Sequence, residues 1–154
     1  MDIRAVHGYL ANTLLKGLAI TQPRAATIKR VYRYLPAMNQ AITDFPCAML
    51  TYVQDEVRYH PALLHKRFTV ELRVVTGEAA VDGDVAADMA AAFNDAIILA
   101  ISGDLTLGGT VTTVTSLRGR EPETLTLWEW AGKGFIGCGL FLEIQMSEAR
   151  QHLA

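Results

Sequence analysis

The chain has 154 residues, of which 51% are hydrophobic and 19% are charged, and its formal net charge is −2. This length predicts one domain with a sizeable core, and the composition excludes a disordered or collagen-like protein. No apolar run reaches the roughly 18 residues of a membrane span, and the N-terminus lacks the pattern of a signal peptide. We therefore expect a protein of cytosolic origin that does not contact a membrane.

The two halves of the chain carry opposite charge. Residues 1–75 hold ten Lys and Arg against five Asp and Glu, a net of +5, whereas residues 76–154 hold four against eleven, a net of −7. If the halves interleave in one compact domain, the surface is an ordinary mixture of charges. Alternatively, the subunit has a basic side and an acidic side, which suits head-to-tail contact with copies of itself. The composition is not that of a dedicated DNA-binding protein.

In chain order, the periodicity first predicts an amphipathic helix over residues 2–19. Residues 27–35 are rich in β-branched and aromatic side chains and predict an extended segment, which leads into a loop over residues 36–46. A short strand over residues 47–53 and a polar connection over residues 54–66 follow.

Residues 67–75 form the cleanest predicted strand, because apolar and polar side chains alternate. Its two faces consist of Phe68, Val70, Leu72 and Val74 on the apolar side, and of Arg67, Thr69, Glu71 and Arg73 on the polar side. A Gly- and Asp-rich loop over residues 77–83 comes next. Asp82 or Asp84 is expected to cap the helix that follows.

The central predicted helix covers residues 84–102 and has one continuous apolar face. That face consists of Val85, Met89, Phe93, Ala96, Ile97, Ala100 and Ile101. Ile98 and Leu99 lie on other faces, which predicts burial on more than one side. Gly103 is expected to end the helix in the left-handed conformation.

After this helix the pattern returns to strands, predicted over residues 110–117, 124–130 and 135–146, with a charged turn over residues 118–123. The sequence therefore predicts an α+β fold in a single domain over residues 1–154. We expect a mixed, mainly antiparallel sheet, with an N-terminal helix and the central helix packed on one face.

The last predicted hairpin carries an aromatic strip on its outer face. A four-residue turn places Trp130 opposite Phe135 and Trp128 opposite Gly137, and Trp128 can then lie over the bare backbone of that glycine. Phe141 continues the strip along the same face. Either the N-terminal helix or a loop covers these aromatic side chains, or they are exposed and mark a protein–protein contact.

The sequence contains no grouping of residues that predicts catalysis. His60 and His65, with Glu56 nearby, could suggest a metal site, but they fall in a Pro-broken connection, so we interpret them as surface loop residues. Cys47 and Cys138 are isolated and are best interpreted as buried thiols. We therefore expect no enzymatic activity and no metal or cofactor.

The order of the elements is similar to that of a known family. An N-terminal helix precedes an extended segment with spaced prolines at Pro36 and Pro46. An alternating strand, an Ala-rich helix, the segment Leu-Thr-Leu-Gly-Gly-Thr-Val-Thr from Leu105 and a long final strand follow. Over essentially its whole length, the chain resembles the tail terminator (tail completion, minor tail protein U-like) family of long-tailed bacteriophages. This family has no signature motif and no catalytic residues.

The resemblance implies a homo-oligomer, a hexameric ring that caps the last ring of tail tube protein and halts tube growth. Such a ring docks to the head connector or neck protein, and DNA passes through its lumen. It lies in the virion at the head-proximal end of the tail, after assembly in the host cytoplasm. Another phage neck or head–tail joining protein, or a small-molecule-binding α+β domain, are the alternatives.

For such a ring, the aromatic strip supplies the candidate contacts with a neighbouring subunit or the tube, namely Trp128, Trp130, Phe135 and Phe141. The charged ends of the hairpin supply candidates for the lumen or the hairpin tip, namely Arg118, Arg120 and Lys133. Because DNA must slide through the ring, we expect few phosphate contacts there.

Overall fold

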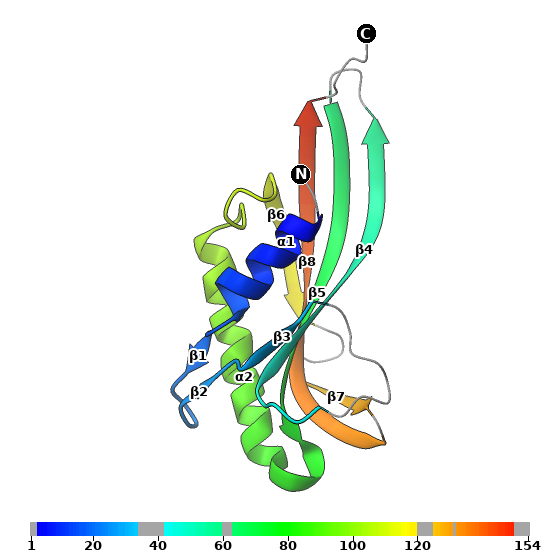
Figure 1. Cartoon of the computed structure of the whole chain (residues 1–154). Coiled ribbons are helices and arrows are strands. Elements are labelled where there is room, and N and C mark those ends of the chain that lie inside the picture. Colours follow the sequence, from blue (N-terminus) through cyan, green and yellow to red (C-terminus); the bar gives the residue numbers. More distant parts are fainter. Residues whose placement is uncertain (1–2, 34–41, 60–62, 120–124, 131, 150–154) are drawn as a thin grey trace.

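The computed structural model describes residues 3–33, 42–59, 63–119, 125–130 and 132–149, and at residues 52–56, 59, 125–127, 130 and 149 it describes the backbone alone. The elements, shown in Figure 1, are α1 (Ile3–Tyr9), the π-helix η1 (Leu10–Leu15), β1 (Ala19–Ile20), β2 (Ala26–Thr27), β3 (Arg30–Tyr32), β4 (Cys47–Tyr59), β5 (Leu63–Glu78), α2 (Ala79–Gly103), β6 (Thr113–Gly119), β7 (Leu125–Trp130) and β8 (Lys133–Ala149).

The main sheet has the strand order β3-β4-β5-β8-β6, and β7 pairs with the first part of β8. The β3–β4 pair is parallel, and the other pairs of this sheet are antiparallel. Strands β1 and β2 form a separate small hairpin. The helices lie on one face of the sheet (Figure 1). The predicted α+β fold, with a mixed, mainly antiparallel sheet and its central helix on one face, is confirmed.

The core lies between α2 and the alternating faces of β5 and β8. On β5, all four side chains of the predicted apolar face are buried, and on β8 the even-numbered side chains from Cys138 to Met146 are buried as well. Met89, Phe93 and Ile97 of α2 pack in the same cluster. The alternate side chains of the two strands and the side chains at helical spacing on α2 therefore form one apolar layer between sheet and helix.

Helix α2 is longer than predicted, because it begins five residues earlier. Its N-cap is Glu78, without a side-chain cap, and Asp82 has non-helical angles (φ −144°, ψ 44°) where two helical pieces join. The predictions of a loop over residues 77–83 and of capping by Asp82 or Asp84 were wrong. The Ala-rich segment from residue 79 continues into helix because alanine has the highest helix propensity.

The end of α2 also differs from the prediction. Gly103 does not have a positive φ; the helix closes with the amide of Asp104 on the carbonyl oxygen of Ile101, at 3.1 Å. The left-handed conformation comes later, at Leu107, Gly108 and the next glycine. Asp104 stabilises this turn by accepting hydrogen bonds from the Thr106 and Gly108 amides, at 3.0 and 2.8 Å.

The prediction that α2 is buried on more than one side was wrong. Leu99 is 76% exposed and Ile98 is 37% exposed, on the side of the helix that faces away from the sheet. By length and composition alone this helix is apolar enough to cross a membrane, but here one face packs on the sheet as in a core helix.

The N-terminal helix is shorter than the predicted range 2–19. Helix α1 passes into the π-helix η1, whose last turn closes with the Lys16 amide on the Ala11 carbonyl oxygen, at 3.1 Å. Gly17, at φ 79°, then reverses the chain, because glycine adopts positive φ without a steric penalty. The remaining residues of the predicted helix belong to the turn and to β1.

Strands β4, β5 and β8 continue past the helices as an arm, defined here as residues 51–59, 63–69 and 143–149 (Figure 1). The predicted connection over residues 54–66 was therefore wrong: most of it pairs as strand. Polar residues interrupt the alternation on which the prediction depended. Cross-strand hydrogen bonds join backbone groups, so they form whatever the polarity of the side chains.

The β7–β8 hairpin has a tighter turn than predicted. Trp130 pairs with Lys133, so Trp128 stands opposite Phe135 and Thr126 opposite Gly137. The register differs by two residues from the prediction based on a four-residue turn. A shift of two residues keeps every side chain on its predicted face, because strand side chains alternate with a period of two.

Candidate functional site

A second apolar cluster covers part of the sheet face that lies opposite α2. Its buried members are Ile42, Cys47, Met49, Val75 and Phe135, and Tyr32, Phe45 and Trp128 pack against them. Phe45 brings its ring to 5.7 Å from that of Phe135, centroid to centroid. The segment that contains Ile42 and Phe45 therefore acts as the loop cover that the sequence left open as one alternative.

This covering segment determines which residues of the aromatic strip are buried. Phe135 is 2% exposed, so its assignment as a surface contact was wrong. Trp128 is half-buried beside it, and Phe141 is half-buried under the guanidinium of Arg118, at 5.3 Å from the ring centre. The side chain of Trp130 lies outside the described residues. The strip is thus partly a core and partly a set of cation–π contacts.

A charged cluster that the sequence did not single out lies in the middle of this face. Arg73 donates two hydrogen bonds to Glu71, with 2.7 Å from Nε to Oε1 and 3.3 Å from Nη2 to Oε2. The same guanidinium lies 5.4 Å from the Trp128 ring centre. The alternation of β5 predicted both residues on a solvated face, whereas the side chain of Arg73 is only 15% exposed and that of Glu71 only 11%. The two hydrogen bonds hold the Arg73 and Glu71 side chains in one arrangement.

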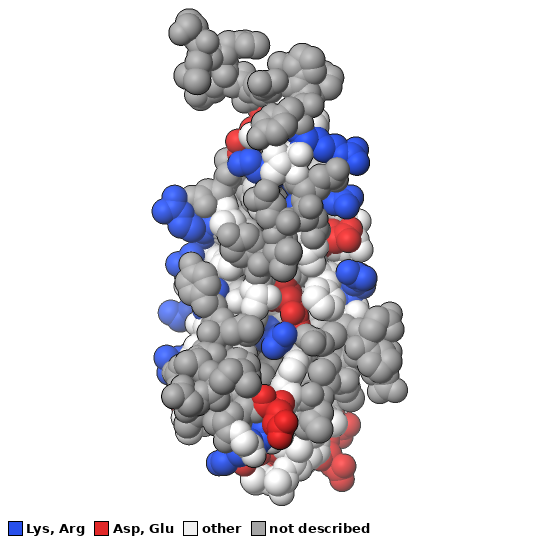
Figure 2. All heavy atoms as spheres, turned by 90° about the vertical axis from the view of Figure 1, so that its right-hand side faces the viewer, with Lys and Arg blue, Asp and Glu red and all other residues white. Residues whose placement is uncertain are grey.

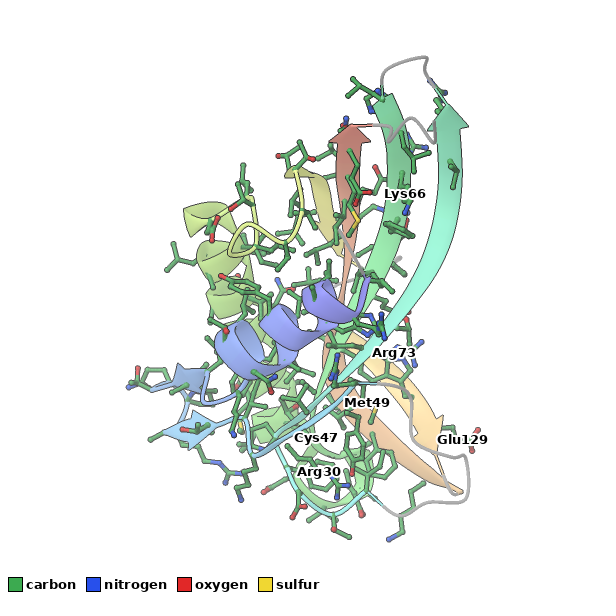
Figure 3. All side chains as sticks on the ribbon, turned by 45° about the horizontal axis from the view of Figure 1, so that its top comes forward. Arg30, Cys47, Met49, Lys66, Arg73 and Glu129 are labelled. Atoms are coloured by element: carbon green, nitrogen blue, oxygen red, sulfur yellow. The ribbon has the colours of Figure 1, made fainter. Side chains whose placement is uncertain are left out.

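The hollow beside this cluster is lined by Ile42, Met49, Arg73, Val75, Trp128 and Phe135. Figure 3 labels Arg73 and Met49, which lie near one another on this part of the sheet. The hollow has a volume of about 10 Å³. That volume is enough for about one water molecule, so this hollow is too small for an organic ligand.

The two charged candidates of the hairpin that the structure describes, Arg118 and Lys133, do not converge. Arg118 stands opposite Phe141 near the middle of β8, whereas Lys133 begins β8 and contacts Glu78 at 3.4 Å. Eight residues of one strand separate these positions, a distance of roughly 26 Å. Arg120 lies outside the described residues. Arg118 and Lys133 therefore cannot contact one small ligand together.

A second hollow lies on the arm and is much larger, at about 310 Å³. It is lined by Arg58, His65, Lys66, Arg67 and Gln145. His65 is part of β5, so its interpretation as a loop residue was wrong; His60 lies outside the described residues. We refer to this hollow as the arm groove. Sequence reasoning missed it because β4 and β5 were not predicted to pair there.

The exposed side of α2 has the opposite charge. Asp82, Asp84, Asp88 and Asp95 are exposed, and the helix contains no Lys or Arg. The charge imbalance between the halves of the chain therefore corresponds in part to two separate surfaces. The exposed side of α2 is acidic, and the groove on the arm is basic. Figure 2 shows Lys and Arg side chains near the end of the molecule that carries the arm and also along the rest of this face.

No family model matches the chain, and no curated protein matches its sequence. The resemblance to tail terminators therefore depends on length and on the order of elements.

Proposed function

We propose that this chain is a phage tail terminator, a structural and non-catalytic subunit of a homo-oligomeric ring. By the resemblance, the ring is a hexamer that caps the tail tube, stops its growth and provides the joining surface for the head connector or neck protein. DNA passes through its lumen. The protein then belongs to the virion, at the head-proximal end of the tail.

The observation that carries this proposal is the free edge of the arm. Strand β3 pairs with β4 only at Cys47–Met49, so residues 51–59 form an edge that no described strand covers. Nine residues of strand extend over roughly 30 Å. The backbone groups of such an edge are a template for pairing with another chain. A neighbouring subunit in a ring supplies that chain.

The charge distribution supports contacts between unlike surfaces. An acidic helix surface and a basic arm on one subunit favour a head-to-tail contact, which closes into a ring when the rotation between subunits allows it. Leu99 and Leu105 are 76% and 47% exposed at the end of α2 and just after it, and they offer apolar contact area beside the aspartates.

Some of the charged and aromatic residues predicted near the hairpin are still candidate contact residues of the proposed ring. Arg118 is exposed next to Phe141, and these two side chains form one candidate contact surface. Lys133 forms a second, separate one. Arg120 and Trp130 remain candidates from the sequence.

Complementation of a phage that lacks this gene tests the proposal. Without the protein we expect tail tubes of uncontrolled length that carry no heads, and the wild-type chain in trans should restore normal tails. Val57→Glu places a charge on the free edge and should fail to restore them. Thr113→Glu, at a half-buried position of β6, is the matched control and should succeed.

Two outcomes would contradict the proposal. Tubes of normal length without the protein would rule out a terminator, and if these tubes also lacked heads, the role would be that of another neck protein. Full rescue by folded Val57→Glu would show that the free edge of the arm does not contact a neighbouring subunit.

A further inference from the structure

The arm groove is built from three adjacent strands. The register places Arg58 of β4 opposite His65 of β5, and Arg67 of β5 opposite Gln145 of β8. Residues that stand opposite one another in neighbouring strands share a face, so these four side chains lie together on the face away from α2. Lys66, labelled in Figure 3 on the arm, also lines the groove.

A hydrogen-bond network orients part of the lining. Ser147 Oγ lies 2.8 Å from His65 Nδ1 and 3.3 Å from Gln145 Nε2. The amide nitrogen of Gln145 can only donate, so the serine oxygen accepts from it and can give its own proton to Nδ1. In the neutral ring, Nε2 then carries the proton and is a hydrogen-bond donor.

The lining is therefore rich in donors. Two guanidinium groups, one ammonium group and an imidazole N–H line the groove, and no carboxylate is among the described side chains of its lining. Planar guanidinium forks match the oxygen geometry of phosphate, and hydrogen bonds between ionised partners are the strong class. The volume of about 310 Å³ falls at the lower end of the range of small-molecule sites, about 300–1,000 Å³.

The surroundings of the groove select for a strongly charged anion. Glu56 stands opposite Arg67 in the backbone register, and Glu148 follows Ser147 on β8. A ligand must compete with the Glu148 carboxylate, whose charge interacts with that of Lys66. A free phosphate or pyrophosphate ion carries about two or more charges, and a nucleic acid backbone presents several singly charged phosphodiesters in a row. Either competes better than one carboxylate with a single charge, because Coulomb attraction is proportional to the charge.

We infer that the arm groove is a binding site for a phosphate-class oxyanion, either a free phosphate or pyrophosphate ion or a phosphodiester of a nucleic acid backbone. Arg58, Arg67 and His65 bind its oxygens on the face away from α2, whereas Lys66 alternates to the other face of β5 and adds its positive charge at the margin of the groove. This site goes beyond the ring proposed above and does not depend on it, because a single chain contains all of its residues.

Titration of the full chain with inorganic pyrophosphate, and separately with a fluorescent single-stranded oligonucleotide, tests this inference. We expect the wild type to bind at least one of the two probes. Arg58→Gln/Arg67→Gln should weaken binding by about tenfold or more, because hydrogen bonds to charged groups are lost. Both side chains are exposed, so the fold should survive, and circular dichroism checks this.

The matched control removes the same charge elsewhere. Arg24→Gln/Lys29→Gln changes two exposed cations outside the groove and should bind as the wild type does. Pyrophosphate binding without oligonucleotide binding identifies a free-ion site. Oligonucleotide binding that weakens linearly on a log scale with salt, and that pyrophosphate displaces, identifies a backbone site.

Three results would overturn the inference. The first is that neither probe binds the wild type. The second is that the control loses as much affinity as the groove variant, which would show only a general effect of charge. The third is that the groove variant leaves probe binding intact but separates associated subunits in sedimentation, which would assign the groove to acidic residues of a second copy.

Discussion

The indole ring of Trp128 lies against the bare backbone of Gly137, although the two residues are diagonal rather than directly opposite in the β7–β8 ladder. A Cβ atom added to Gly137 would come within 2.6 Å of Trp128 Cζ3 and would also overlap the carbonyl group of Val74. The glycine is therefore needed for close approach on two sides, by the aromatic ring and by the neighbouring strand.

Gly137→Ala should destabilise the protein by about 3 kcal/mol or more, because overpacking of this kind costs 1–3 kcal/mol and here one obstacle is backbone. Chemical denaturation measures the change. Gly8→Ala is the control: nothing lies within 4 Å of its added Cβ, and alanine should stabilise α1 by up to about 1 kcal/mol. Equal stability of wild type and Gly137→Ala would show that the two strands do not approach this closely.

Phe93→Ala should lower the free energy of unfolding by roughly 3–5 kcal/mol, because it removes a fully buried aromatic side chain from the core. Leu99→Ala on the same helix should change it by less than about 0.5 kcal/mol, since this side chain is mostly exposed and isolated surface changes have small effects. If the two variants lost similar stability in denaturant, the orientation of α2 would be wrong.

The orientation of α2 is the part of the fold that the sequence determined best. Phe93 lies at helical spacing from other apolar residues of α2, and Val70 lies in a strand in which apolar and polar residues alternate. Both patterns can be recognised without knowledge of tertiary contacts. The burial of Phe135 could not be predicted in this way, because the segment around Ile42 that covers it has no periodicity. A covering loop leaves no regular pattern in the sequence.

The arm groove could not be predicted from the sequence for a different reason. Arg58 and His65 are seven residues apart in a segment whose polarity predicts a connection, and only the pairing of β4 with β5 brings them together. The hairpin register failed similarly, since it depends on the turn at residue 132 and the strand pattern is the same after a shift of two residues. Pairing across strands, rather than local propensity, decides both features.

His7 should make stability depend on pH in the weakly acidic range. Burial, with the nearby Arg33 charge, lowers the pKa of His7 below its ordinary value of 6.5. As the pH falls through 6.5, the unfolded chain takes up a proton that the folded chain does not, so the free energy of unfolding decreases until the folded pKa is reached. Denaturation between pH 7.5 and pH 5 measures this slope, which should be smaller in His7→Gln. An identical slope in the variant would assign the effect to other groups.

The two cysteines should be inert in the folded protein. Burial raises the pKa of both Cys47 and Cys138 to about 12, so almost no thiolate exists at neutral pH, and the thiolate is the reactive form. A thiol reagent at pH 8 should label neither residue in the native state and both after unfolding. Rapid labelling of either thiol in native protein would contradict the burial of its strand.

We propose that copies of this chain form a ring at the end of a phage tail. Cryo-electron microscopy of purified tails tests it most directly, because it shows copy number and position together. We expect six copies of the 16.8 kDa chain in one ring at the head-proximal end, with the β4 edge of each subunit against its neighbour. A single copy per tail, or tails that lack the protein altogether, would contradict it.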